Sequence, residues 1–338
     1  MLSVNNLSLY YEVDDGRIHA LDDISFELES QTITGLLGES GCGKSTLSEA
    51  LVRHLAPNAH ITSGEILLHG ENILEMSDQR LREMRWNEIA YIPQAAMNSL
   101  NPVATIKEQL IEPLTVNNST TKREAVERAK EVLSMVDIDE SRLKAYPHQL
   151  SGGMKQRVIV AMAMILEPDL IIADEPTTGL DVLVRDKILS DIERFRDELG
   201  ISIIFVSHDI ADLVETSDSL MVMYGGKVVE KGPSRELFEE PTHPYTIGLK
   251  NSLPNINSEL EELIRMEMDP PDLRSLSSEC RFVDRCPFDV PECHEAHPPF
   301  ESARADIESA CYRADEFEEL NRRAFDVDWR QEEIEHVR

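Results

Sequence analysis

The chain has 338 residues, of which 41% are hydrophobic, so it can bury the core of one large domain or of two smaller ones. Its 64 acidic and 33 basic residues give a formal net charge of −31, which disfavours binding to nucleic-acid phosphates and direct insertion among anionic lipids. Attachment to a membrane would therefore need a protein partner. So large a negative charge is typical of a halophilic protein. At 1 M salt the Debye length falls to ~3 Å, so the acidic side chains hardly repel one another. An ordinary acidic protein is the alternative.

The N-terminal segment carries no signature of a targeting sequence. Residues 1–9 alternate apolar and polar side chains as a strand does. The longest apolar run, residues 158–166, has about half of the ~20 residues that a bilayer requires. The sequence therefore predicts a soluble, cytoplasmic protein.

The predicted elements change from antiparallel strands to alternating strands and helices. Residues 1–37 alternate as antiparallel strands with a turn at Asp14-Asp15-Gly16. Strands followed by helices then indicate an α/β fold with a mostly parallel sheet. Helices are predicted at 47–54 and 122–136, edge strands at 63–68 and 88–93, and buried strands at 32–37, 166–174, 201–208 and 219–224.

Composition divides the chain into three regions. Residues 1–235 hold the α/β pattern, with a charged helical segment at about 95–160. A break marked by prolines follows near Pro233, and residues 254–315 are rich in proline, acidic residues and cysteine, which predicts a small separate module at 236–315. Residues 316–338 are predicted to form an acidic, solvated terminal helix or tail.

A glycine-rich loop follows the predicted strand at 32–37. Residues 38–46 read Gly-Glu-Ser-Gly-Cys-Gly-Lys-Ser-Thr and match the phosphate-binding pattern G-x-x-x-x-G-K-[ST] between a strand and a helix. Lys44 should reach the β- and γ-phosphates of ATP, and the Ser45 hydroxyl should hold Mg²⁺. A chance glycine-rich turn is the alternative. The residues predicted to bind nucleotide here are Gly38, Ser40, Gly41, Cys42, Gly43, Lys44, Ser45 and Thr46.

Two carboxylates end a later buried strand. Asp174 and Glu175 follow Leu170-Ile171-Ile172-Ala173, and ligands of open α/β sheets lie at such strand ends. Asp174 is predicted to complete the Mg²⁺ shell, and Glu175 to act as the catalytic base toward water. An exposed turn is the alternative. His208 ends the next strand and is predicted to contact the γ-phosphate, although a packed core histidine is the alternative.

Residues 150–156, Leu-Ser-Gly-Gly-Met-Lys-Gln, resemble the signature motif of ABC-type ATPases. Over residues 2–235 the chain repeats that family's order of motifs, including Gly179-Leu180-Asp181. The resemblance implies a RecA-like P-loop core with an antiparallel β subdomain and a helical signature subdomain. It also implies that two subunits sandwich two ATP molecules. Its implied nucleotide contacts beyond the phosphate loop are Tyr11 on adenine, Gln94 near Mg²⁺, and Ser151, Gly152, Gly153, Gln156 and Asp181.

Two further segments, 97–103 and 241–246, resemble the oligopeptide/dipeptide importer ATPases, a subfamily that includes nickel importers. This resemblance implies an ATPase heterodimer, two transmembrane permease subunits and an external substrate-binding protein. It places the chain at the cytoplasmic face of the cell membrane as a peripheral subunit. The alternatives are an importer motor for nickel or an oligosaccharide, and a soluble ABC ATPase acting on DNA or ribosomes.

Four of the five cysteines, Cys280, Cys286, Cys293 and Cys311, have the spacing C-x₅-C-x₆-C-x₁₇-C. Four thiolates select an iron–sulfur cluster or tetrahedral zinc, and zinc sites usually pair cysteines at shorter spacing. The pattern also resembles that of peptide-importer ATPases, which implies a 4Fe–4S cluster. Zinc and four free thiols are the alternatives.

Overall fold

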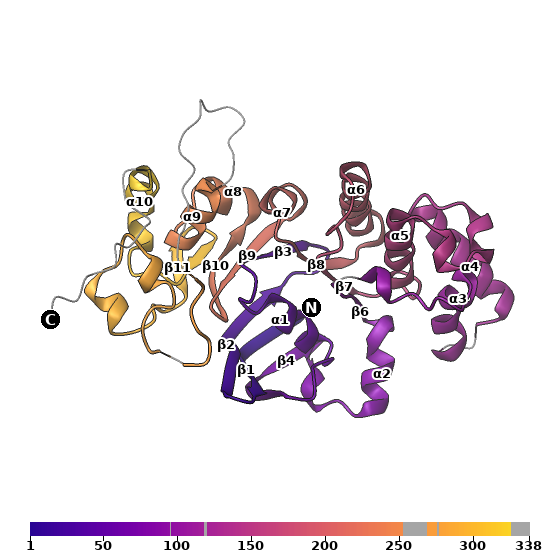
Figure 1. Ribbon diagram of the computed structural model, residues 1–338, viewed down its shortest axis with the longest axis horizontal. Helices are drawn as coiled ribbons and strands as arrows, with labels where there is room; N and C mark the ends of the chain where they lie inside the picture. The colour runs from indigo at the N-terminus through magenta and orange to yellow at the C-terminus, as the bar shows by residue number, and fades with distance from the viewer. Residues whose placement is uncertain (95, 118–119, 253–268, 276, 326–338) are drawn as a thin grey trace.

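The computed structural model describes residues 1–94, 96–117, 120–252, 269–275 and 277–325. A small antiparallel sheet packs beside a larger mixed sheet, with a helical segment at one end of the molecule and the C-terminal segment at the other (Figure 1). Within these residues, no helix is both long and apolar enough to span a bilayer.

The small sheet begins as predicted, with two antiparallel strands around the turn at residues 14–16. β1 (Leu2–Val13) pairs with β2 (Gly16–Leu28) on one side and with β4 (Ala59–Leu68) on the other. The predicted edge strand at 63–68 is therefore the end of a longer strand, and only the two residues of β5 (Glu71–Asn72) cover its far side. Alternate residues of β1 face the core, which is the burial expected of a half-buried strand.

The large sheet has the strand order β11-β12-β10-β9-β3-β8-β7-β6. Its parallel half, which the sequence predicted, consists of β3 (Ile33–Leu37), β6 (Ile89–Ile92), β7 (Leu170–Asp174), β8 (Ser202–Val206) and β9 (Ser219–Tyr224). The prediction that β7 begins at residue 166 is wrong, because Glu167 has a φ of 54° and a proline follows it. The antiparallel half was not predicted, and it consists of β10 (Lys227–Pro233), β12 (Ile307–Ser309) and β11 (Glu301–Arg304).

Two helices in the first half of the chain were predicted from the sequence. α1 (Lys44–Leu51) follows the glycine-rich loop and ends three residues before the prediction. The predicted helix at 122–136 is confirmed as α4, which a Thr121–Glu124 capping box starts. The helices that follow α1 in the first two hundred and twenty residues, α4 included, are α2 (Asp78–Asn87), α3 (Ile106–Asn117), α4 (Lys122–Met135), α5 (Gly152–Ala163), α6 (Val182–Leu199) and α7 (Ile210–Thr216), with short 3₁₀ turns at Ile73–Glu75, Ala96–Asn98, Glu140–Lys144 and Pro147–Gln149.

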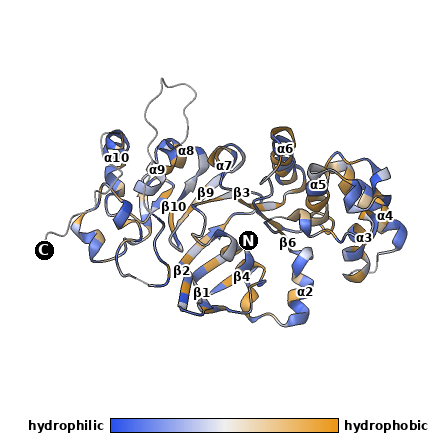
Figure 2. Ribbon diagram, in the orientation of Figure 1, coloured by the Kyte–Doolittle hydropathy of each residue, from blue (hydrophilic) through white to orange (hydrophobic). Residues whose placement is uncertain are grey.

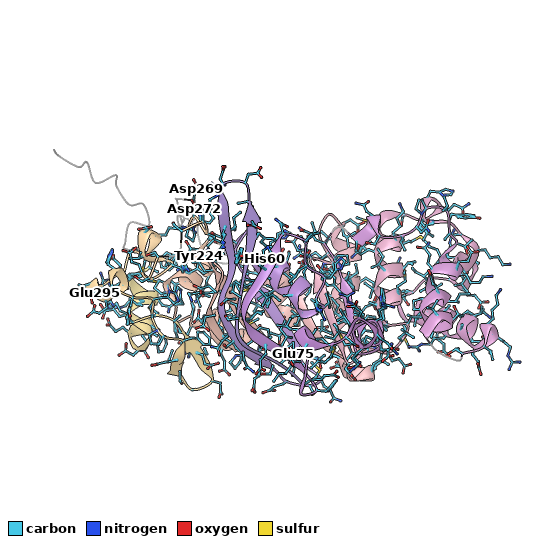
Figure 3. All side chains as sticks on the ribbon, turned by 90° about the horizontal axis from the view of Figure 1, so that it is seen from below. His60, Glu75, Tyr224, Asp269, Asp272 and Glu295 are labelled. Carbon is cyan, nitrogen blue, oxygen red and sulfur yellow. The ribbon has the colours of Figure 1, made fainter. Side chains whose placement is uncertain are left out.

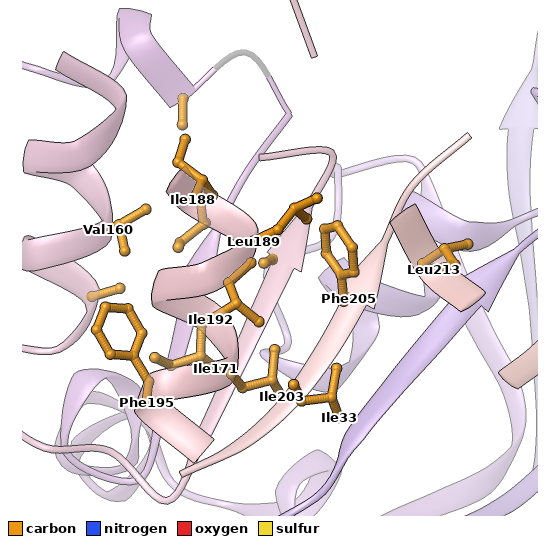
Figure 4. Packing of buried hydrophobic residues seen from close by; sticks show 14 of the residues in the cluster. Ile33, Val160, Ile171, Ile188, Leu189, Ile192, Phe195, Ile203, Phe205 and Leu213 are labelled. Atoms are coloured by element: carbon orange, nitrogen blue, oxygen red, sulfur yellow. The ribbon is translucent and has the colours of Figure 1, made fainter. Parts of the chain in front are cut away.

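The core forms where the helices cover the parallel strands. Strand residues Ile171 and Ile203 pack beside Ile188, Ile192 and Phe195 of α6 (Figure 4). Figure 2 shows the corresponding hydropathy, with apolar residues concentrated in the strands of the large sheet and on the covered helix faces. Burial of each such side chain stabilises the fold by about 1.5–3 kcal/mol, which fixes the strand ends that carry the candidate site.

The C-terminal segment continues the large sheet. β12 pairs with β10, and the buried Cys280, Phe282 and Leu320 belong to the same apolar cluster as the strands of the parallel half. The predicted terminal helix is α10, which ends at Arg323; residues 326–338 lie outside the described residues. The remaining elements are α8 (Ser234–Glu239), α9 (Pro244–Asn251), α10 (Phe317–Arg323) and 3₁₀ turns η5 (Val283–Arg285), η6 (Pro291–His294) and η7 (Ala314–Glu316).

Candidate nucleotide site

The glycine-rich loop joins β3 to α1 at the carboxyl edge of the parallel strands. Gly43, the last residue before α1, has a φ of 110°, and a Cβ at this position would lie 2.5 Å from the Ala20 carbonyl oxygen. Only glycine therefore fits here. The buried Lys44 ammonium donates hydrogen bonds to the carbonyl oxygens of Gly38 (2.7 Å) and Glu39 (2.9 Å). The loop thus holds the Lys44 ammonium, the cation that is predicted to bind the phosphates, through two of its own carbonyl oxygens.

The other loop residues separate into buried and exposed side chains. Cys42 is buried, and this burial raises the pKa of its thiol. Ser40 and Gly41 lie at the outer side of the loop. Thr46, in the first turn of α1, accepts a hydrogen bond from the Tyr11 hydroxyl at 3.2 Å.

Tyr11 and Tyr10 are consecutive in β1, so their rings lie on opposite faces of the strand. The hydrogen bond to Thr46 puts Tyr11 on the side of the loop. Tyr10 instead stacks on His60 with ring centroids 5.1 Å apart, beneath the guanidinium of Arg17. The geometry thus favours Tyr11 over Tyr10 as a ring near a bound nucleotide.

Asp174, at the end of β7, has the environment of a metal ligand. Its carboxylate is only 1% exposed and its Oδ1 has no hydrogen-bond partner among the described residues, while Oδ2 accepts a 3.5 Å hydrogen bond from the Tyr91 hydroxyl. Burial raises the pKa of Asp174, and a hydrogen bond with Ser45 opposes that rise. A buried carboxylate oxygen without a partner, beside a serine hydroxyl, fits the hard oxygen ligands that Mg²⁺ prefers.

The Glu175 carboxylate lies beside two other residues predicted from sequence, Gln94 and His208. Its Oε2 accepts hydrogen bonds from Gln94 Nε2 and from Thr178 Oγ1, both at 3.0 Å, and lies 3.6 Å from His208 Nδ1. The residue also has a φ of 51°, in the left-handed region that a non-glycine residue rarely adopts. Such backbone conformations are concentrated at functional sites, and the Glu175 carboxylate contacts Gln94 and lies near His208.

The segment predicted as a signature motif forms the start of α5. Ser151 caps this helix by accepting a hydrogen bond from the Met154 amide, and Ser151 and Gly152 are exposed. A Cβ at Gly153 would lie 2.8 Å from the Val184 side chain, so glycine permits the close approach of α5 to α6. Gln156 is buried inside the helical segment, which does not favour its predicted contact with a nucleotide.

The N-terminus of α6 lies beside the signature segment. Asp181 caps α6 by accepting a hydrogen bond from the Val184 amide at 3.1 Å. The next two residues, Val182 and Leu183, are 69% and 81% exposed. These two side chains form a small exposed apolar surface beside Asp181.

Several residues at the site were not predicted. Thr178 donates a hydrogen bond to the Glu175 carboxylate. Arg185 of α6 donates hydrogen bonds to the carboxylates of Asp209 and Asp212, just after His208. Arg285 and Tyr245 contact Glu39 within the phosphate loop. Thr178 could have been found from its place three residues after Glu175. The other three depend on contacts between distant parts of the chain, for which the sequence carries no local signal.

The four C-terminal cysteines line one small cavity with His243, Phe282 and Phe288. A hydrogen bond between Cys280 and Cys293 raises the pKa of Cys280 and lowers that of Cys293, and burial raises the pKa of Cys286. In the described part of the chain, however, no three His, Cys, Asp or Glu side chains are arranged to hold a metal ion. This geometry does not support the predicted iron–sulfur or zinc centre.

The motif geometry agrees with comparisons to protein families. The model of the ABC transporter family matches residues 21–178. A second model, of the C-terminal region of oligopeptide/dipeptide transporters, matches residues 229–293. The two matches cover the glycine-rich loop, the signature segment, the Asp174-Glu175 pair and three of the four C-terminal cysteines.

Individual relatives align over almost the whole chain. The dipeptide transport ATP-binding protein DppD of Caldanaerobacter subterraneus is 39% identical and covers 94% of this chain and 98% of its own length. The oligopeptide transport ATP-binding protein OppD of Salmonella typhimurium is 38% identical, with 93% of each chain covered. The dimeric post-hydrolysis structure of the ATP-binding cassette MJ0796 bound to ADP and Pi aligns with a TM-score of 0.63 and 27% identity, over 70% of this chain and 99% of that one. The chain therefore belongs to the ABC transporter family, among the ATP-binding subunits of oligopeptide and dipeptide transporters.

Proposed function

We propose that the chain binds and hydrolyses ATP at the site around Lys44 and that it thereby powers an importer of dipeptides or oligopeptides. The observation that carries this proposal is the meeting of Lys44, Asp174, Glu175 and His208 at one edge of the parallel strands. A phosphate loop, a buried magnesium carboxylate and a second carboxylate as base are the parts that ATP hydrolysis requires. Peptide as the transported solute follows from the relatives DppD and OppD, which are named for dipeptide and oligopeptide transport.

Each residue of the site has a distinct part in hydrolysis. The loop amides and Lys44 bind the phosphates, and Lys44 exchanges its bonds to Gly38 and Glu39 for phosphate oxygens. A Mg²⁺ ion held by Ser45 and Asp174 would neutralise charge on the phosphates. Glu175 accepts a proton from the attacking water, while Gln94 and Thr178 keep its carboxylate oriented. His208, whose Nδ1 lies 3.6 Å from Glu175 Oε2, is proposed to donate a hydrogen bond to the γ-phosphate.

The active form is proposed to be a dimer of ATP-binding subunits. Ser151 and Gly152 are exposed at a helix start, where backbone amides can bind an anion that a second subunit presents. The exposed Val182 and Leu183 beside Asp181 supply an apolar surface for such an interface. The relative MJ0796 is dimeric in its solved structure. A second, similar ATPase as the partner follows from the importer resemblance.

A groove between α2, β6 and α5 is proposed as the surface for a permease. It is lined by apolar and aromatic side chains, including Trp86, Pro93, Leu100 and Met162. Nearby Val103 is 81% exposed. The chain would be held at the cytoplasmic face of the membrane by two permeases, which receive the solute from an external substrate-binding protein.

Three finer assignments are proposals as well. The domain limits 1–235 with a helical signature subdomain at 95–160, 236–315 and 316–338 rest on composition and on the family matches. A haloarchaeal origin rests on the net charge of −31. A 4Fe–4S cluster, or zinc, at Cys280, Cys286, Cys293 and Cys311 is supported by the cavity that the four side chains share. The arrangement of the described side chains, in which no three are placed to hold a metal ion, does not support it.

Metal analysis of protein purified without oxygen tests the last of these assignments. A 4Fe–4S cluster gives a brown preparation that absorbs near ~400 nm and holds about four irons per chain. One zinc per chain without colour contradicts the cluster and leaves a metal site. A preparation without metal contradicts both.

The transported solute is tested on the complete transporter in vesicles. ATP hydrolysis is measured with the substrate-binding protein and one candidate solute at a time: a dipeptide, an oligopeptide, Ni²⁺ or an oligosaccharide. The proposal expects stimulation by a peptide. Stimulation by Ni²⁺ or by the sugar alone would contradict the peptide assignment and would leave the ATPase assignment standing.

A further inference from the structure

Arg285 of the cysteine-bearing segment forms an ion pair with the phosphate loop. Its Nη1 and Nη2 donate to Oε2 and Oε1 of Glu39 at 2.8 and 2.9 Å. Glu39 is the second residue of the loop, 246 positions earlier in the chain. Two parallel bonds between a guanidinium and a carboxylate fix both distance and orientation, so this pair holds the two segments in one geometry.

The surroundings of Arg285 keep its side chain in place. Its Nη1 also donates to the Tyr224 hydroxyl at 3.2 Å, and the guanidinium lies 5.6 Å from the Tyr224 ring centroid and 5.9 Å from that of Phe282. Tyr224 lies where the large sheet meets the C-terminal segment (Figure 3). A side chain held by aromatic rings and by a hydroxyl loses little further freedom when it pairs with Glu39.

A second contact from the same region reaches Glu39. The Glu39 amide donates to the hydroxyl of the fully buried Tyr245, in α9, at 2.9 Å. The Glu39 carbonyl oxygen accepts from Lys44. Glu39 is thus held through its carboxylate by Arg285, through its amide by Tyr245, and through its carbonyl by the lysine that the proposed function assigns to the phosphates.

We propose that Arg285, supported by Tyr245, is a positioning residue that pre-organises the phosphate loop for MgATP. A loop that already has its binding conformation does not lose that freedom on binding, so the pair should lower the dissociation constant for MgATP. The cysteine-bearing segment then has a part in nucleotide binding, although it touches no nucleotide. This inference rests on the proposed nucleotide site around Lys44.

The same segment provides a matched control. Arg281 lies four residues before Arg285, and both arginine side chains are 5% exposed. The Arg281 Nη2 atom pairs with Asp22 Oδ2 of β2 at 2.7 Å, and it does not contact the phosphate loop in the described structure. Arg281→Gln therefore removes a comparable buried ion pair between the segment and the core without touching Glu39.

The test measures the dissociation constant for MgATP on the full chain by calorimetry, with thermal stability recorded for each variant. Arg285→Gln should raise this constant about tenfold, and Arg285→Lys should raise it less because lysine keeps the charge and loses the paired bonds. Arg281→Gln should change it less than about twofold. In the assembled transporter, the KM of Arg285→Gln should rise while kcat at saturating ATP stays close to wild type.

A double-mutant cycle with Glu39→Gln tests the route of the effect. If Arg285 acts through Glu39, the double variant should bind MgATP about as weakly as either single variant. Glu39→Gln also serves if Arg285→Gln does not fold. Wild-type affinity in Arg285→Gln, an equal loss in Arg281→Gln, or fully additive losses in the cycle would overturn the inference. A wild-type chain that binds no MgATP would instead overturn the proposed site.

Discussion

Replacement of Glu175 by glutamine should abolish turnover while ATP stays bound. The amide has the shape of the carboxylate and its oxygen can still accept from Gln94 and Thr178, but it cannot accept a proton from water. Loss of a general base lowers the rate by about 10²–10⁴-fold. At 1.36 kcal/mol for each factor of ten, this corresponds to about 2.7–5.4 kcal/mol of transition-state stabilisation. The dissociation constant for MgATP should stay near that of the wild type.

The assay is ATP hydrolysis by the assembled transporter, with MgATP binding measured in parallel. Glu88→Gln is the control. The Glu88 side chain is 24% exposed, against 16% for Glu175, and it pairs with Arg80. Glu88 precedes β6, so it lies at the edge of the parallel strands opposite to the edge that carries Glu175. Glu88→Gln should leave turnover unchanged. Hydrolysis by Glu175→Gln near the wild-type rate would refute the assignment of Glu175 as the base.

Three further outcomes are expected. Lys44→Ala should weaken MgATP binding about 10- to 100-fold, because it removes the buried cation of the phosphate loop, and unchanged binding in calorimetry would contradict this. The melting temperature should rise as KCl is raised toward molar levels, since screening shortens from ~30 Å at 0.01 M to ~3 Å at 1 M; a flat curve would contradict the halophile proposal. Burial raises the pKa of Glu230 to about 7. The folded protein therefore keeps the Glu230 proton at a pH where the unfolded chain has lost it, so Glu230 costs no stability below pH ~4.5, and the free energy of unfolding falls as the pH rises from there through 7. Glu230→Gln should therefore raise the melting temperature at pH 8 more than at pH 5, and equal shifts would contradict that reasoning.

The parts of the fold that the sequence predicted are those with a local signal. The phosphate loop was predictable because its glycines encode a local conformation, as the positive φ of Gly43 confirms. β9 was predicted with its observed bounds, Ser219–Tyr224, because an uninterrupted apolar run lies between turn residues. The start of β7 was misplaced, because the prediction carried the strand back across Glu167-Pro168-Asp169, whereas the buried apolar residues of the strand begin only at Leu170.

The parts that were not predicted depend on distant contacts. β11 and β12 join the large sheet about seventy residues after β10 ends at Pro233, and no local pattern in so short a strand as Ile307–Ser309 indicates its partner. The same is true of Arg285, whose neighbours in sequence give no reason to expect a bond to Glu39. The candidate site was therefore predictable as a set of motifs, whereas the residues that orient them were not.

The central claim is that ATP hydrolysis by this chain powers peptide import. Its most direct test is the uptake of a labelled peptide into vesicles that carry the complete transporter, with MgATP supplied on the side of this chain. We predict that uptake occurs against a gradient with the wild-type chain and stops with Glu175→Gln in this subunit. Uptake that continues with Glu175→Gln, or wild-type hydrolysis that moves no peptide, would contradict the account.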